Sequence, residues 1–386
     1  MSPGRLHAAT IAEDPDDPRP TRLIVDLGAL EGNLRALQAH VGPGVGLMPI
    51  LKANAYGHGL VPVARRLEAA GAGSFGVAYL EEGLLLRRAG VRAPVLVLGG
   101  VVGSQIPRFL HHDLSLTASS VDKLRAIEAA AAALGRRARV HLKIDTGMER
   151  IGVHWYSAAA LLDESLRCAH VDVEGVYSHL ARSDEADPAP TRLQLERFFE
   201  ALDFYRRRGL PTPPRHLANS GGLLQHPDTW LELARPGIAL YGVPPDPAVP
   251  LPAGLRPALR WETRVVYFKV VRAGAPVSYG GTWAPAADTR VITLPVGYGD
   301  GYLRALSGRA EVLVGGRRCP VVGRVCMDQM MVDIGWGEAY NGDPVVLLGE
   351  LGGATIDASE LAARAGTIAY EILTNINTRV PRVYVG

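Results

Sequence analysis

The chain has 386 residues, of which 47% are hydrophobic and 21% charged, and its formal net charge is +2. This composition is typical of a globular protein long enough for two domains, and the small net charge gives no electrostatic case for nucleic-acid binding. The sequence contains no apolar stretch of the length that crosses a bilayer, so we expect no membrane segment.

Residues 1–20 are rich in aspartate and proline and contain no apolar run typical of a signal peptide. We therefore expect a disordered lead-in at residues 1–20. The three cysteines, Cys168, Cys319 and Cys326, follow no zinc-binding spacing. A reduced, cytoplasmic setting is the simplest interpretation of these thiols.

From about residue 46, short apolar runs alternate with stretches of helical periodicity. Parallel strands that are buried on both faces have continuous apolar sequences, and eight such runs are the number that a (β/α)8 barrel requires. We therefore predict a TIM-type barrel over residues 21–255, with a doubly wound open sheet as the alternative. We expect the early strand at residues 23–27, outside the eight, to join a second domain. The eight runs are "LMPILKA", "SFGVAYL", "APVLVLGG", "DLSLTA", "RVHLKID", "VEGVYSH", "RHLANS" and "ARPGIALYG".

The sequence changes character near residue 250. A proline-rich connector is followed by β-type runs closed by turns, and no long helical pattern intervenes until "DASELAARAGTIAYEIL". This pattern predicts a mainly antiparallel β domain over residues 256–386.

Polar side chains gather at the predicted ends of the barrel strands, where barrel enzymes place their functional groups. Lys52 ends the first strand, and "NSGG" and "RPGI" follow the seventh and eighth strands, where a phosphate commonly binds. A phosphate site together with a strand-end lysine points to pyridoxal 5′-phosphate, which forms a Schiff base with lysine. Taken singly, each feature has a plainer explanation as a surface lysine, a turn or a core histidine.

The sequence resembles the alanine racemases from about residue 21 to its end. The first motif, "KANAYGHG" at Lys52, is similar to the pyridoxal-phosphate attachment signature of that family, and the others follow in the same order along the chain. Many ordered motifs together are far more specific than any single pattern. The further motifs are "LKIDTGMERIGV", "VEGVYSHLARSDE", "HLANSGG", "RPGIALYG", "VSYGGTW", "LPVGYGDGY", "GRVCMDQMMVD" and "RVPRVY".

The resemblance implies an enzyme that interconverts L-alanine and D-alanine and supplies D-alanine for peptidoglycan. It also implies a homodimer in which each active site combines one subunit's barrel with its partner's C-terminal domain. Lys52 and the partner's Tyr279 would then be the two catalytic bases, one for each face of the substrate.

The resemblance assigns further roles residue by residue. Arg235 would face the pyridine nitrogen of the cofactor and keep the ring a weak electron sink, and His179 would orient Arg235. Arg150 and the backbone of Met327 would bind the substrate carboxylate, and a carbamylated Lys143 would hold Arg150. The implied phosphate contacts are Tyr56, Ser220, Gly237, Ile238 and Tyr370, and the implied entrance residues are Tyr298 and Tyr370.

Three alternatives remain at this point. The first is a racemase of the same fold with broader specificity, or one acting on serine or lysine, against which the entrance tyrosines argue. The second is a pyridoxal-dependent decarboxylase or aldolase, against which Tyr279 and Arg235 argue. The third is a cofactor carrier without enzymatic activity, which would not need the second domain.

Overall fold

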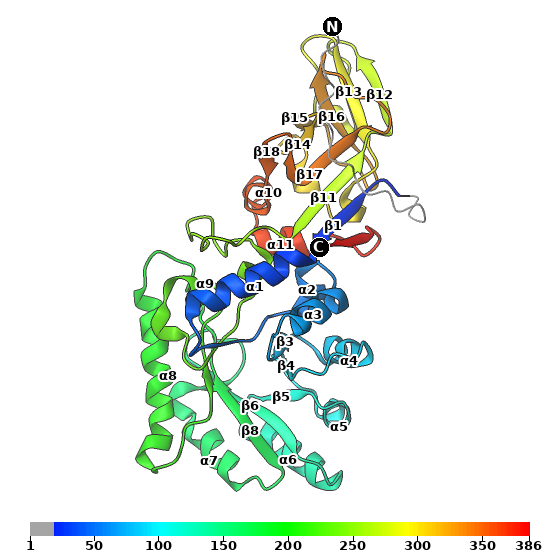
Figure 1. The fold of residues 1–386 in the computed structure, drawn as a ribbon. Helices are drawn as coiled ribbons and strands as arrows, with labels where there is room; N and C mark the ends of the chain where they lie inside the picture. Colours follow the sequence, from blue (N-terminus) through cyan, green and yellow to red (C-terminus); the bar gives the residue numbers. More distant parts are fainter. Residues whose placement is uncertain (1–18) are drawn as a thin grey trace. The chain divides into compact units, whose positions relative to one another are not determined.

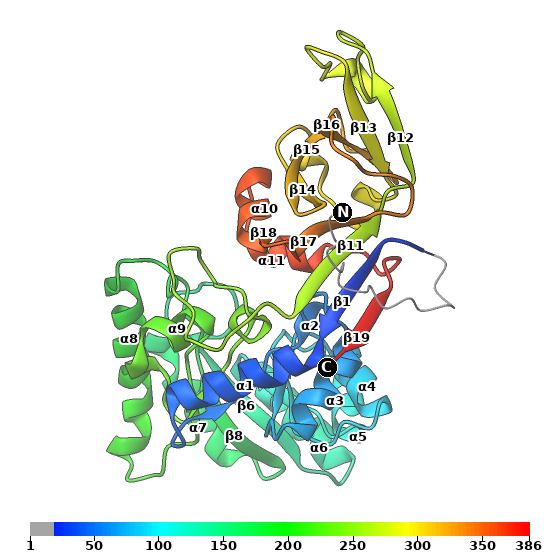
Figure 2. The same cartoon turned by 45° about the horizontal axis from the view of Figure 1, so that its top comes forward.

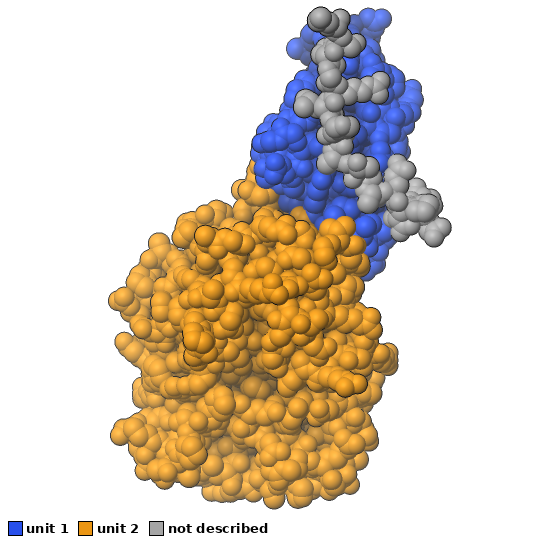
Figure 3. All heavy atoms as spheres, in the orientation of Figure 1, with its two compact units in different colours: residues 1–24, 260–356, 377–383 blue, residues 25–259, 357–376, 384–386 orange. Residues whose placement is uncertain are grey.

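The structure is a computed structural model that describes residues 19–386, so the predicted lead-in lies outside the described residues except for its last two. The chain divides into two compact units (Figure 3). Unit 1 comprises the residues up to 24 together with residues 260–356 and 377–383, and unit 2 comprises residues 25–259, 357–376 and 384–386.

Unit 2 contains a curved parallel sheet in which each strand pairs with its neighbour in chain order. The strands of this sheet are β3 (Phe75–Val77), β4 (Val95–Val97), β5 (Ser115–Ala118), β6 (Ala138–Asp145), β8 (Val171–Tyr177) and β9 (Arg215–His216), with the short β7 (Val153–His154) beside β6. Strands β3 to β6 are fully or almost fully buried, as strands covered on both faces must be, and β8 is buried over its last three residues.

Two further strands close this sheet into a ring. β10 (Leu233–Ala234) pairs in parallel with β2 (Gly46–Leu47). A parallel bridge between Ile50 and Gly76 joins the segment after β2 to β3. On the other side, the backbone N–H of Arg235 donates to the carbonyl of Ala218 at 2.9 Å, which joins the segments that follow β10 and β9. The predicted eight-stranded barrel is therefore confirmed, and the open-sheet alternative is excluded.

Helices follow most of the barrel strands and lie around them (Figure 1). They bury one face each; α3, for example, buries Leu60, Val63, Ala64 and Leu67. The helices of this layer are α1 (Leu27–Val41), α3 (Leu60–Ala69), α4 (Leu80–Arg88), α5 (Ile106–His111), α6 (Val121–Ala133), α7 (Ala159–Arg167), α8 (Ala189–Arg207) and α9 (Ser220–Gln225).

Unit 1 is built on a mainly antiparallel sheet, as the sequence predicts. Its strand order is β12-β13-β16-β15-β14-β17-β11-β1-β19, with β18 on β17, and β12, β13 and β16 lie side by side in Figures 1 and 2. The strands are β1 (Arg22–Asp26), β11 (Leu259–Arg264), β12 (Tyr267–Val271), β13 (Thr289–Leu294), β14 (Glu311–Val314), β15 (Arg317–Val322), β16 (Met330–Gly335), β17 (Pro344–Leu351), β18 (Ala354–Ile356) and β19 (Arg382–Val385).

The late helical segment forms two short helices, α10 (Ala358–Ala365) and α11 (Ala369–Thr374), and both belong to unit 2. Tyr370 is therefore part of the same compact unit as the barrel. Among the described residues, no helix is long and apolar enough to cross a membrane.

A buried asparagine ties the first helix of unit 2 to the segment that follows the barrel. The side chain of Asn33 is fully buried. Its Nδ2 donates to the carbonyls of Leu240 and Arg256, and its Oδ1 accepts from the backbone N–H of Arg256, each at 2.9 Å. Buried polar groups that lose their partners are costly, so this contact stabilises unit 2.

We expect Asn33→Ala to lower the stability of the protein by about 1–3 kcal/mol, because the buried carbonyl of Leu240 and two part-buried backbone groups of Arg256 lose their partner. Thermal unfolding followed by circular dichroism measures the effect. The control is Gln38→Ala, which removes bonds to the carbonyls of Gly42 and Val45 at a partly exposed position. Equal shifts of the unfolding midpoint in the two variants would contradict the prediction.

Candidate active site

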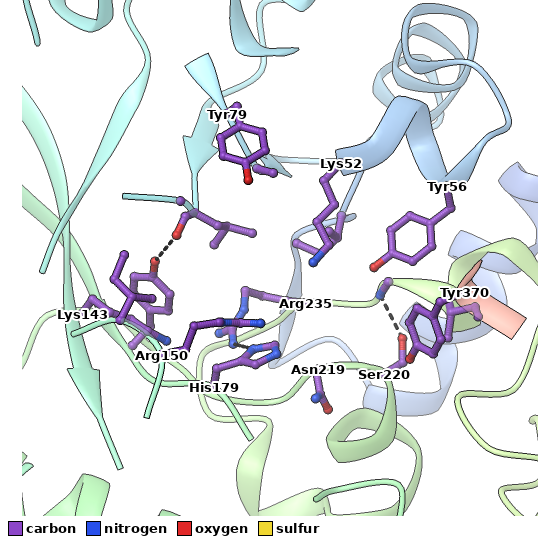
Figure 4. A pocket seen from close by; sticks show the side chains of 18 of the residues that line it. Lys52, Tyr56, Tyr79, Lys143, Arg150, His179, Asn219, Ser220, Arg235 and Tyr370 are labelled. Carbon is purple, nitrogen blue, oxygen red and sulfur yellow. Dashed lines mark hydrogen bonds between the residues drawn. The ribbon is translucent and has the colours of Figure 1, made fainter. Parts of the chain in front are cut away.

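A pocket of about 440 Å3 lies within unit 2, at the ends of the barrel strands (Figure 4). It brings together ten residues that the sequence identified, which come from distant parts of the chain. Lys52, Arg150, His179 and Arg235 surround one region of it, and Tyr56, Ser220 and Tyr370 surround another. The ten are Lys52, Tyr56, Lys143, Arg150, His179, Ser220, Arg235, Gly237, Ile238 and Tyr370.

Lys52 directly follows the buried Leu51, in the segment after β2, and begins the turn α2. Burial lowers the pKa of its ammonium group, and the positive charges of Arg150 and Arg235 lower it further, against the opposing effect of Glu82. A lowered pKa increases the share of neutral amine, the form that attacks a carbonyl carbon.

The backbone after Lys52 forms a left-handed turn. Ala53, Asn54, Ala55 and Tyr56 all have φ between 52° and 56°, a conformation that costs roughly 1–2 kcal/mol per residue for L-amino acids. This turn (α2, Lys52–Tyr56) directs Tyr56 into the pocket. Such strain persists only where surrounding contacts hold it.

Three side chains hold the turn in place. Glu82 accepts a hydrogen bond from the backbone N–H of Ala53 at 2.7 Å. His58 is buried, and its Nδ1 lies 3.1 Å and 2.9 Å from the carbonyls of Ala55 and Tyr56. The Asn54 side chain accepts from the N–H of Leu60 at 2.8 Å.

Ser220 and the segment after β10 form a cradle of hydrogen-bonding groups. The backbone N–H groups of Gly237 and Ala239 both point at Ser220 Oγ, at 2.9 and 3.2 Å. Burial raises the pKa of Tyr56 above its ordinary value, so its phenol keeps its proton and can donate. Hydroxyl and backbone N–H donors gathered in this way suit an anion such as a phosphate.

Arg235 is almost completely buried and is held by acceptors on several strands. Its NH2 group donates to the carbonyls of Ser178 and Leu217 at 2.8 and 3.0 Å. His179 Nδ1 lies 3.3 Å from the same nitrogen, as expected for a residue that orients Arg235. Burial lowers the pKa of the guanidinium to about 10, so it remains charged at neutral pH.

His179 is a neutral imidazole. Its pKa lies well below the ordinary value because the ring is buried and because Arg235, Lys143 and Arg150 are positively charged. Its Nδ1 can therefore accept a hydrogen bond from Arg235.

Lys143 and Arg150 lie on the other side of the pocket. The pKa of Lys143 is lowered well below its ordinary range by burial and by the charge of Arg235, and its Nζ lies 4.3 Å from the ring centre of Tyr177. The loop that carries Arg150 is folded by Asp145. That carboxylate accepts from the backbone N–H groups of residues 147–150 at 2.8–3.2 Å.

Several residues of this site had no role assigned from the sequence. His58 and Asp145 stand among the polar residues at the strand ends but had no stated function, whereas Glu82, His216 and Tyr177 were not identified. Glu82, His58 and Asp145 hold the backbone of the two loops, and His216 and Tyr177 contact Arg235 and Lys143. His58 and Asp145 lie inside the motifs "KANAYGHG" and "LKIDTGMERIGV", which was the available signal. No motif around Glu82 indicates its role, because that role is a hydrogen bond with the backbone of Ala53, which lies far from it in the sequence.

Three predicted site residues, Tyr279, Tyr298 and Met327, belong to unit 1 and do not line this pocket. They are exposed by 71%, 42% and 54%. Tyr279 lines a separate hollow of about 700 Å3 in unit 1, together with Ser278, Cys326 and other residues.

The pocket fits pyridoxal 5′-phosphate in two independent ways. A methyl group on Gly237 would lie 2.5 Å from the hydroxyl of Tyr56, so only glycine leaves the cradle open there. Four basic side chains, one of them the partly desolvated Lys52, line the same space, which suits an anionic carbonyl cofactor. Fold and site together define a barrel enzyme that works with such a cofactor.

Comparisons with known proteins agree with this class. The family model for the alanine racemase N-terminal domain matches residues 25–245, and that for the alanine racemase C-terminal domain matches residues 258–384. The alanine racemase of Symbiobacterium thermophilum is 49% identical over 97% of this chain and 99% of its own length. The chain therefore belongs to the alanine racemase family, whose members are pyridoxal-phosphate-dependent isomerases.

Solved structures are similar over nearly the whole chain. Alanine racemase from Bacillus anthracis with bound L-Ala-P has a TM-score of 0.89 and 35% identity, and the match covers 96% of each chain. Alanine racemase from Bartonella henselae, with covalently bound pyridoxal phosphate, has a TM-score of 0.87 and 29% identity over 95% of this chain and 100% of that chain.

We expect Gly237→Ala to weaken the binding of pyridoxal 5′-phosphate by about tenfold or more, because the added methyl group displaces the Tyr56 hydroxyl. Fluorescence titration of the apoprotein with the cofactor measures the dissociation constant. The control is Gly32→Ala, the same change at a helical position with open space around it. Unchanged cofactor affinity in Gly237→Ala would show that this cradle does not hold the phosphate.

Proposed function

We propose that this alanine racemase interconverts L-alanine and D-alanine by a two-base mechanism that uses Lys52 and Tyr279. The lowered pKa of Lys52 in a pocket of cations is the observation that carries the proposal. When bound, the cofactor ring withdraws electrons from the substrate's α-carbon and so makes the α-hydrogen acidic.

Two proton-transfer groups are needed, because racemisation removes a proton from one face of the α-carbon and returns one to the other. Lys52 would hold the cofactor, and its amine would take or return the proton on one face of the substrate. The hydroxyl of the partner subunit's Tyr279 serves the opposite face. The high exposure of Tyr279 supports this role, since a tyrosine offered to a partner's site must not be buried in its own unit.

Arg235 holds the ring nitrogen of the cofactor. Even with its pKa lowered to about 10, the guanidinium is a poor acid compared with a carboxylic acid. Arg235 would therefore leave the ring nitrogen largely unprotonated, and the bound cofactor would draw electrons less strongly than it does beside a carboxylic acid. His179 orients Arg235 by accepting a hydrogen bond from it at Nδ1.

The substrate carboxylate binds Arg150, assisted by the backbone of the partner's Met327. Lys143 is carbamylated: its neutral amine adds to carbon dioxide and loses a proton, which leaves an anion beside Arg150. The strongly lowered pKa of Lys143 supports this, because only the neutral amine reacts. A cation in that place would repel Arg150.

The cofactor phosphate is held by the hydroxyl and backbone groups of Tyr56, Ser220, Gly237, Ile238 and Tyr370. Tyr370 and the partner's Tyr298 narrow the substrate entrance, which favours alanine over larger amino acids. A racemase of broader specificity, or one for serine or lysine, would need a wider entrance and is the alternative.

The working form is a homodimer in which the barrel domain, residues 21–255, meets the partner's β domain, residues 256–386. The enzyme acts in the cytoplasm, where it supplies D-alanine for peptidoglycan. The three free cysteines support a reducing compartment.

We expect Tyr279→Phe to lower alanine racemisation by about 100-fold or more, the usual contribution of a general acid or base. Lys52 remains in this variant, so α-hydrogen exchange in D2O persists for one enantiomer only. Proton NMR of L-alanine and D-alanine incubated separately measures both effects. Tyr267→Phe, at an exposed tyrosine of the same unit, is the control. Full racemisation by Tyr279→Phe would exclude the two-base scheme.

The shared site can be tested by mixing two inactive variants, Lys52→Ala and Tyr279→Phe. A mixed dimer holds one site with both changes and one with neither, so random mixing restores about a quarter of the wild-type sites in a symmetric dimer. The rate of D-alanine formation before and after subunit exchange measures the recovery. If each subunit carries a complete site of its own, no activity returns.

A further inference from the structure

A series of polar side chains runs from Arg235 through the barrel and away from the pocket; Arg235, His216 and His141 are buried, and Glu174 at the far end is partly exposed. Arg235 NH1 lies 2.9 Å from His216 Nδ1, and His216 Nε2 lies 2.9 Å from His141 Nδ1. His141 Nε2 in turn faces Glu174 Oε2 at 3.7 Å, an electrostatic contact that is longer than a hydrogen bond. The Ser115 hydroxyl donates to the same carboxylate oxygen at 2.6 Å.

Arg235 at one end of this series of side chains and Glu174 at the other determine which histidine nitrogens carry protons. Arg235 can only donate, so His216 Nδ1 must accept. His216 is fully buried and neutral, because burial and the charge of Arg235 lower its pKa well below the ordinary value. Its one proton therefore sits on Nε2 and points at His141 Nδ1, which must accept in turn. His141 then carries its own proton on Nε2, towards Glu174, whose carboxylate attracts it.

The barrel backbone is shaped around His141. The register of β6 against β8 shifts between Val140 and His141, and this shift places His141 opposite Gly175. A methyl group on Gly175 would lie 2.6 Å from His141 Nδ1, the atom that faces His216. Any other residue at 175 would collide with the imidazole in this position.

Aromatic contacts fix the rings in the same arrangement. Tyr177 stacks on His216, with ring centres 4.6 Å apart and planes at 5°, and it meets His141 edge-on. The hydroxyl of Tyr177 is held by Thr117 at 2.8 Å. At the far end, Arg139 lies 3.6 Å from the second oxygen of Glu174, so the carboxylate stays charged.

We propose that Glu174 and His141 are positioning residues for the racemase reaction, which set the tautomer of His216 so that it always accepts from Arg235. Neither residue lines the pocket. Without an acceptor at His141 Nδ1, the buried Nε2–H of His216 has no partner, and the cost of that unpaired donor opposes the preference of Arg235 for a proton-free Nδ1. The Nδ1–H tautomer then becomes populated, and its proton faces the N–H of Arg235. Arg235 then loses its 2.9 Å bond and shifts within the pocket.

The catalytic part of this inference rests on the proposed role of Arg235 at the ring nitrogen. We expect Glu174→Ala and His141→Phe to lower kcat for alanine by about tenfold, the usual size of effect when a group that orients an active-site residue is lost. KM should change less than about twofold, and side transamination per turnover should rise several-fold. Glu174→Gln keeps one acceptor oxygen and should recover much of the loss.

The deciding experiment is 15N NMR of the histidine side chains, recorded on the apoprotein. In the wild type, His216 should carry its proton on Nε2, and in Glu174→Ala and His141→Phe the Nδ1–H form should appear. The control is Glu128→Gln, which alters another glutamate–histidine pair, with His170 at 2.8 Å on the barrel surface. It should leave His216 and the kinetics unchanged.

The inference is overturned if His216 keeps its proton on Nε2 in both test variants, or if their kinetics match those of Glu128→Gln. If either variant fails to fold, Glu174→Gln replaces it, and we then expect a smaller change in the His216 tautomer and in kcat. A failure of the proposed role of Arg235 would give a different result. Arg235→Lys would then leave racemisation unchanged, whereas the NMR spectrum of the apoprotein would still report the tautomer of His216.

Discussion

Four basic side chains, Lys52, Lys143, Arg150 and Arg235, share one partly buried pocket, and the crowding of so many groups that could each carry a positive charge shapes the chemistry of the site. Repulsion and burial together lower the pKa of each lysine and keep His179 neutral. A pocket of this kind attracts an anionic ligand and produces neutral amines, the two conditions that attachment of pyridoxal phosphate requires.

Such a pocket exists only because the surrounding fold can hold it. Arg235 is bound by acceptors at the ends of two strands, β8 and β9, and Asp145 folds the loop that carries Arg150. The left-handed turn after Lys52 stores strain that Glu82 and His58 offset with hydrogen bonds. The rigidity of a closed barrel supports all of these contacts, because its strand ends cannot move apart independently.

Much of the fold and the site could be predicted from local patterns. Each of the eight apolar runs overlaps a barrel strand, although the first and the eighth do so only at Leu47 and Ala234. The motif residues Lys52, Ser220 and Arg235 do meet in one pocket. Glu82 and Glu174 could not be identified in this way. Each acts through a partner from another part of the chain, residue 53 for one and His141 for the other, so no neighbouring residue reveals its role. The same holds for α11, which lies late in the sequence but within the barrel unit.

The sequence by itself determined the fold class and the residue types at the strand ends, because strand periodicity, turn residues and motifs are local properties of the chain. It therefore also determined which cations and hydroxyls were available for chemistry. Only the tertiary structure decided their protonation states and their hydrogen-bond partners. Burial and the charges of residues far apart in the chain set a pKa or a tautomer, and those quantities exist only after the barrel has closed around them.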